Sequence, residues 1–191
     1  MRVYSINTGN EKTEAVLKTL AAALGGAQQL SGKEAQESAA VTHFVRGDLV
    51  LIGAAAADGR VPDKALGYLT GFQAAGAGAV YVVTEASGDP GDAILELRKS
   101  MEDCGFASVA ALAAAEAVTA EELAEGAAGV RDKAIYPLAW GDFFVPGRYP
   151  YHTPEEYRAE KAQGSGRRSF FASLFGGKKE EAEQKRFCYY R

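Results

Sequence analysis

The sequence predicts an α/β fold in which a parallel sheet is covered by helices on both faces. The first observation is that short apolar runs alternate with amphipathic segments about five times, at the spacing of βαβ units. The second is that residues 48–53 (DLVLIG) form a continuous apolar run bounded by an acid and a glycine, and residues 79–84 (AVYVVT) show the same buried pattern. Such runs are typical of central strands buried on both faces. Together they predict a doubly wound parallel sheet.

The first predicted strand, residues 3–6, ends at the polar turn Asn7-Thr8-Gly9-Asn10. A helix follows at once, because apolar residues recur on one helical face until Gly25-Gly26 end the pattern. Residues 27–30 are a weaker strand candidate, and residues 31–40 are polar and alanine-rich, which predicts a loop with a short helical turn.

The central part of the chain repeats this order. The strand at 48–53 leads into a loop of small residues at 54–60, and a helix follows Pro62. The strand at 79–84 leads into a polar loop at 85–90.

The next segments complete the sheet. Residues 91–104 predict a helix that Gly105 ends, and residues 106–112 predict the last strand. Residues 119–126 predict a short helix, with Thr119 as the N-cap and Glu122 three residues later as a capping box.

Ligands of such sheets bind beyond the carboxyl ends of the strands, which here predicts a site lined by loops 7–13, 54–60 and 85–90. The turn after the first strand places backbone N–H groups at a helix N-terminus, which favours a phosphate. Thr8 and Thr13 add hydroxyl donors to it. The alternative is that this turn is only a capped junction between strand and helix.

Composition limits the function classes. The net charge of −4 disfavours a nucleic-acid-binding role for the whole chain. The sequence lacks a signal pattern and an apolar run of about 18 residues, which predicts a cytoplasmic protein without a transmembrane segment. Cys104 and Cys188 form no CxxC motif, and we predict no metal site. No nucleophile or metalloprotease motif is present either, so we predict no catalytic residue.

The C-terminal part differs from the rest, which predicts a domain at 1–129 and an extension at 130–191. Residues 136–191 hold 13 of the 19 aromatic residues. Residues 167–191 carry seven basic and three acidic residues, a net charge of +4, so residues 1–166 carry −8. We expect residues 136–191 to dock on a partner protein or to pack back on the domain.

Residues 2 to about 123 resemble a flavodoxin-like domain, and are most similar to the flavodoxin half of bacterial flavodoxin–ferredoxin fusion proteins. The stretches that carry the resemblance are Thr8-Gly9-Asn10, Gly53 with Gly59-Arg60-Val61-Pro62, residues 79–84, and residues 91–97 (GDAILEL) leading to Cys104-Gly105-Phe106. The resemblance implies a five-stranded sheet in the order 2-1-3-4-5, noncovalent FMN, and electron transfer to a redox partner rather than substrate turnover.

The resemblance also implies which residues surround the FMN. The phosphate would lie on the first loop and the ring between the second and third. The expected cofactor-binding residues are Asn7, Thr8, Gly9, Asn10 and Thr13; Gly53, Ala54, Ala57, Asp58 and Gly59; and Glu85, Ser87, Gly88 and Asp89.

The chain departs from the family pattern around that site. Ile6 and Glu11 stand where the phosphate loop usually has hydroxyl residues, and alanines at 54–57 stand where an aromatic residue usually stacks on the ring. The cysteines of the ferredoxin half are missing. Two functions therefore stay open: an FMN-dependent electron carrier, or its descendant with weakened flavin binding, and a non-catalytic binding or assembly module that grips a protein partner.

Overall fold

A central sheet organises the structure, a computed structural model that describes residues 1–30, 43–85, 91–114, 119–135 and 187–189. Its six strands follow the order β2-β1-β4-β6-β7-β8, and the first five run parallel. Those five have the predicted order 2-1-3-4-5, which is confirmed. The strands are β1 (Arg2–Asn7), β2 (Gln28–Leu30), β4 (Asp48–Ala55), β6 (Gly78–Thr84), β7 (Ala107–Ala114) and β8 (Phe187–Tyr189).

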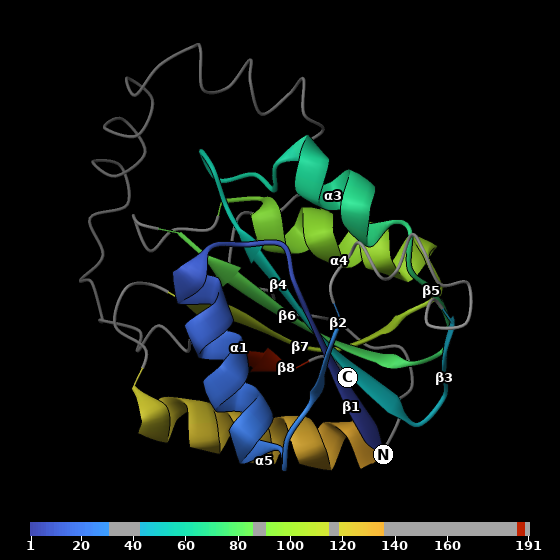
Figure 1. Ribbon diagram of the computed structural model, residues 1–191, viewed down its shortest axis with the longest axis vertical. Coiled ribbons are helices and arrows are strands. Elements are labelled where there is room, and N and C mark those ends of the chain that lie inside the picture. Colours follow the sequence, from blue (N-terminus) through green and yellow to red (C-terminus); the bar gives the residue numbers. More distant parts are fainter. Residues whose placement is uncertain (31–42, 86–90, 115–118, 136–186, 190–191) are drawn as a thin grey trace, which may run out of the picture.

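Helices cover both faces of this sheet, as Figure 1 shows. Alternate side chains of a strand point to opposite faces, so β4 sends Leu49 and Leu51 to one core and Val50 and Ile52 to the other. The first core lies under α1 and α5, and the second lies under α3 and α4. The helices are α1 (Glu11–Ala23), α3 (Asp63–Leu69), α4 (Ala93–Asp103) and α5 (Ala120–Ile135).

Helix α5 is longer than the sequence predicted. It begins directly after Thr119, as expected, but it continues past residue 126 and across the expected domain boundary at residue 129. Ala127 and Val130 are both buried in the core beneath α1. The apolar face therefore extends the helix beyond Gly126, which alone does not end it.

A second, two-stranded parallel sheet joins β3 (His43–Val45) to β5 (Gln73–Ala75), which the sequence did not predict. Phe44 of β3 anchors it, with its ring centroid 6.0 Å from that of Phe72 and 5.6 Å from that of Phe106. Strands of three residues are too short to show an alternating pattern, so this sheet is specified by its aromatic contacts.

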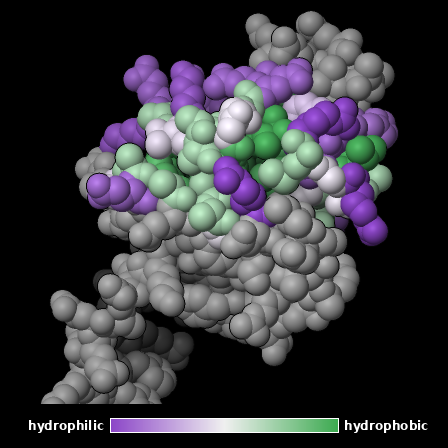
Figure 2. All heavy atoms as spheres, turned by 90° about the horizontal axis from the view of Figure 1, so that it is seen from below, coloured by the Kyte–Doolittle hydropathy of each residue, from purple (hydrophilic) through white to green (hydrophobic). Residues whose placement is uncertain are grey.

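Few large hydrophobic side chains are exposed on the part of the surface that the structure describes. Among described residues, Met1 and Val45 are the large hydrophobic side chains that are exposed. On the face seen in Figure 2, strongly hydrophilic side chains (purple) border residues of weakly hydrophobic character (pale green). None of the helices in the described ranges has the length and hydropathy that crossing a membrane requires.

Most of the C-terminal extension, residues 136–186 and 190–191, lies outside the described residues, as do the predicted loop at 31–40 and residues 86–90. Within the extension, β8 pairs antiparallel with β7. The sheet thus has one strand more than predicted, and its last strand comes from the far end of the chain.

Candidate functional site

The candidate site lies where β1, β4 and β6 end side by side. Asn7 is the register partner of Gly53, and Gly53 is the partner of Val82, so the loops that follow these strands share one edge of the sheet. The backbone N–H and the hydroxyl of Thr8 both donate to the Gly53 carbonyl, each at 2.9 Å. The first two predicted loops therefore meet, as expected from a parallel sheet.

We call Asn7-Thr8-Gly9-Asn10 the elbow. It enters α1 through a capping box: the Asn10 side chain accepts from the Thr13 N–H at 3.1 Å, and the Asn10 N–H donates to the Thr13 hydroxyl at 3.3 Å. The Gly9 N–H donates to the Asn7 side-chain oxygen at 2.9 Å. Side chains of the elbow and of the first helical turn therefore satisfy the donors of Gly9, Asn10 and Thr13.

The elbow is also packed tightly against its neighbours. A Cβ at Gly9 would lie 2.2 Å from the Thr13 hydroxyl oxygen and 2.9 Å from the Ala55 backbone nitrogen, so only glycine fits there. The Thr13 hydroxyl, which is buried, shares a further hydrogen bond of 2.7 Å with the hydroxyl of Thr84 at the end of β6. These contacts tie the elbow to the ends of both β4 and β6.

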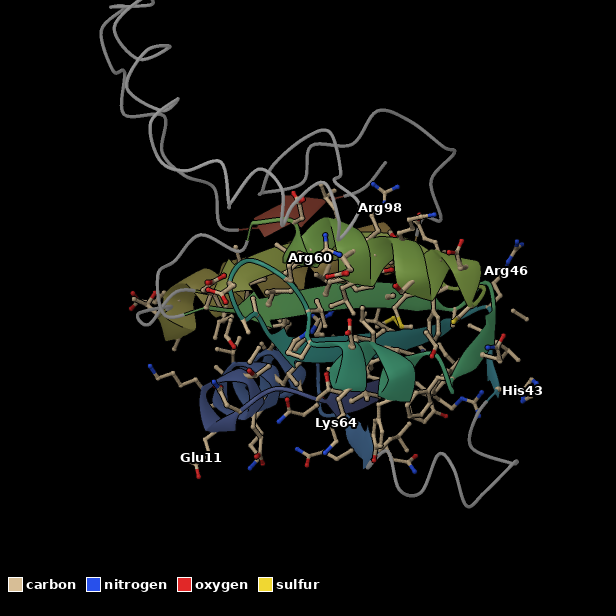
Figure 3. The ribbon with its side chains drawn as sticks, turned by 90° about the horizontal axis from the view of Figure 1, so that it is seen from above. Glu11, His43, Arg46, Arg60, Lys64 and Arg98 are labelled. Carbon is tan, nitrogen blue, oxygen red and sulfur yellow. The ribbon has the colours of Figure 1, made fainter. Side chains whose placement is uncertain are left out.

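Carboxylates stand at the start of α1. Glu11 is exposed and Glu14 is half-buried, both in the first helical turn. In Figure 3, Glu11 points outward from the beginning of the helix. Their charge is favourable beside the positive end of the helix dipole, and it opposes an additional anion at the same place.

The second loop begins later than predicted. Ala54 belongs to β4 and is fully buried, so it does not line the loop. The loop instead contains a two-residue turn, in which Ala57 and Arg60 exchange backbone hydrogen bonds of 2.9 and 3.1 Å. Asp58 and Gly59 occupy its centre with φ of 55° and 75°, which is the conformation of a type I′ turn.

Helix α4 holds this turn in place. The Asp92 N–H donates to the Gly59 carbonyl at 2.9 Å, and the Val61 N–H donates to a carboxylate oxygen of Glu96 at 2.9 Å. Glu96 also pairs with the Arg60 guanidinium. Burial raises the pKa of Glu96, while the Val61 N–H and Arg60 act in the opposite direction. Figure 3 shows Arg60 lying over α4.

Of the expected cofactor-binding residues, the structure brings together Asn7, Thr8, Gly9, Asn10, Thr13 and Gly53, and it places Ala57, Asp58, Gly59 and Glu85 in the two neighbouring loops. Ser87, Gly88 and Asp89 lie outside the described residues. Sequence reasoning assigned no role to Thr84 and Glu96. Thr84 is a polar residue at the end of a buried strand, and Glu96 is a polar residue on the inner side of a helix. A polar residue within an apolar pattern is the signal that could have found each of them.

The described residues contain no group of three or more histidine, cysteine, aspartate or glutamate side chains that could hold a metal ion. The site therefore consists of backbone amides, short polar side chains and carboxylates. Such a set of groups can position a bound molecule by hydrogen bonds and charge.

Comparison with known proteins reveals the fold. No family model and no curated protein matches the sequence. Among solved structures, oxidised flavodoxin 1 from Bacillus cereus is similar over 68% of this chain and 96% of its own, with 16% identity and a TM-score of 0.50. A short-chain flavodoxin associated with a non-canonical PDU bacterial microcompartment is similar over 70% and 99%, with 15% identity and a TM-score of 0.50. With the strand order above, these likenesses identify a flavodoxin-like fold.

Proposed function

We propose that this chain is a flavodoxin-like protein that has lost tight FMN binding and holds a protein partner without catalysing a reaction. The observation that supports this most directly is the capping box between Asn10 and Thr13. The N–H groups of Gly9, Asn10 and Thr13, which would lie near an FMN phosphate, donate to side-chain oxygen atoms of the chain itself.

The elbow as it stands does not fit a phosphate. Binding one would require the chain to exchange its own bonds, each with a net value of about 1 kcal/mol, for bonds to the ligand. Glu11 adds repulsion at the same helix end. The second loop, with Ala57-Asp58-Gly59 at its turn, offers no ring to stack on a flavin, which forgoes a further ~1 kcal/mol.

The second candidate is the FMN-dependent electron carrier that the family resemblance implies. The placement of the elbow favours it: β1 lies between β2 and β4, so the elbow stands at the topological switch point of the sheet. Such a protein would pass electrons to a redox partner instead of turning over a substrate. The closer similarity to flavodoxin–ferredoxin fusion proteins stays a prediction.

Titration with FMN separates these two functions. We expect flavin fluorescence and the melting temperature of the protein to show a dissociation constant weaker than about 1 mM, which is about 4 kcal/mol of binding free energy. A yellow purified protein, or binding in the micromolar range, would support the electron carrier.

Two variants identify the obstacle to binding. Glu11→Thr removes the charge and keeps the capping box, whereas Thr13→Ala removes the acceptor of the Asn10 N–H and keeps the charge. We expect Glu11→Thr to remain unable to bind FMN tightly, because the elbow donors stay satisfied. Tight binding by Glu11→Thr alone would mean that repulsion, and not the capping box, excludes the phosphate.

A further inference from the structure

The outer edge of β7 is covered by the far end of the chain. Strand β8 pairs antiparallel with it through Ala110–Tyr189, Ala111–Cys188 and Leu112–Phe187. Figure 1 shows β8 beside β7, and β8 also lies next to α5. This pairing departs from the βαβ plan, because the five preceding strands of the sheet are all parallel.

The β7 edge is suited to recognition through the backbone. An edge strand presents a row of N–H and C=O groups that a further strand can pair with. The side chains of Ala110, Ala111 and Leu112 are fully buried on the two faces of the sheet. A strand that adds to this edge therefore binds mainly through hydrogen bonds to the backbone of β7, which is the mode of β-augmentation.

Strand β8 is the kind of segment that can leave this edge. It has three residues, Phe187–Tyr189. Ladders of so few residues are weak on their own.

Charge indicates what kind of strand the edge accepts. Residues 1–166 carry a net charge of −8, and β8 is bordered by Lys185, Arg186 and Arg191. An extended segment with basic residues beside an aromatic–small–aromatic core is therefore attracted electrostatically to the acidic body.

We propose that the β7 edge is a docking site for a partner protein, which inserts a basic-bordered extended segment antiparallel to β7 in place of β8. Strand β8 then occupies the partner's place within the same chain and covers the edge until the partner strand displaces it. This names the kind of partner for the proposed binding function and rests on that function.

The test uses the full chain and a fluorescent synthetic peptide of residues 183–191. In the variant Cys188→Pro/Tyr189→Pro, two consecutive prolines remove whichever N–H of β8 faces β7, since these donors alternate along a strand. We expect the peptide to bind this variant at least tenfold more tightly than it binds the wild-type chain, measured by fluorescence anisotropy. Ala172→Pro, a control outside β8, should behave as wild type.

A second variant locks the edge shut. Ala111→Cys stands opposite Cys188 in the ladder, so mild oxidation should join them and abolish peptide binding, which reduction restores. Absence of peptide binding to the double-proline variant that retains its melting transition, or equal binding to all variants, would overturn the proposal. If the double-proline variant does not fold, unchanged peptide binding to the oxidised Ala111→Cys chain would overturn it.

Two further outcomes have distinct meanings. If a second copy supplies the strand, the wild-type chain forms dimers as its concentration rises and the double-proline variant stays monomeric, which would overturn docking of a different partner. Micromolar FMN binding together with the expected peptide binding would refute the loss of flavin binding and leave the strand site standing.

Discussion

Replacing Asn10 with alanine tests whether the elbow is held by its own side chains. The side chain of Asn10 accepts the Thr13 N–H at 3.1 Å, and Thr13 is fully buried. Loss of an N-cap side chain costs about 0.5–2 kcal/mol, and a buried donor left without its acceptor places this case near the upper end. We therefore expect Asn10→Ala to lower the free energy of unfolding by about 1–2 kcal/mol.

Urea denaturation followed by far-ultraviolet circular dichroism measures this loss. With an m-value of roughly 2 kcal/mol per molar urea, the midpoint should fall by roughly 0.5–1 M. The matched control is Asn10→Asp, which keeps the cap acceptor and should stay within a few tenths of a kcal/mol of the wild type. A midpoint for Asn10→Ala equal to that of Asn10→Asp would refute the reasoning.

Three other changes test the contacts around the site. Thr13→Val should leave the buried Thr84 hydroxyl without its 2.7 Å partner and lower the free energy of unfolding by about 1–3 kcal/mol. Adding Thr84→Val should restore part of this loss. If the effects of the two single substitutions simply add in the double-mutant cycle, the interaction between the two hydroxyls is refuted. Burial raises the pKa of Glu96, so the wild-type protein should be most stable relative to Glu96→Gln below the ordinary pKa of 4.5. This relative stability should be lost as the pH rises through the raised pKa, and a pH-independent difference in urea midpoint would contradict the prediction. Gly91→Ala places a Cβ 2.7 Å from the facing turn and should destabilise more than Gly26→Ala, which has positive φ but open space around it; equal losses of melting temperature would rule out the steric part.

The sequence predicted the parallel sheet because its central strands are buried on both faces. The runs around Leu51 and Val82 do not alternate with polar residues that could occupy a solvent face, and this pattern predicts a covered parallel strand. The length of α5 was harder to predict, since Gly126 suggested an end that the buried Val130 overrides. Strands β3 and β5 depend on contacts of Phe44 with distant rings, which periodicity does not reveal.

The sequence predicted the elbow as a turn between a strand and a helix, but not the hydrogen bonds within it. The order strand, elbow, helix placed Asn10 at a helix N-terminus, and both a phosphate and a capping side chain satisfy the same donors there. Which of the two applies depends on the rotamers of Asn10 and Thr13, and the Thr13 hydroxyl is held by its hydrogen bond with the Thr84 hydroxyl. That contact joins residues far apart in the sequence.

The most direct test of the account is a proton–nitrogen NMR titration of the labelled full chain with FMN, following the backbone amides of Gly9, Asn10 and Thr13. Because these amides donate to side-chain oxygens of the chain itself, we predict that their resonances keep their positions at equimolar FMN. Large, saturable shifts confined to these three amides would show that the elbow opens to receive the phosphate, and would contradict the account.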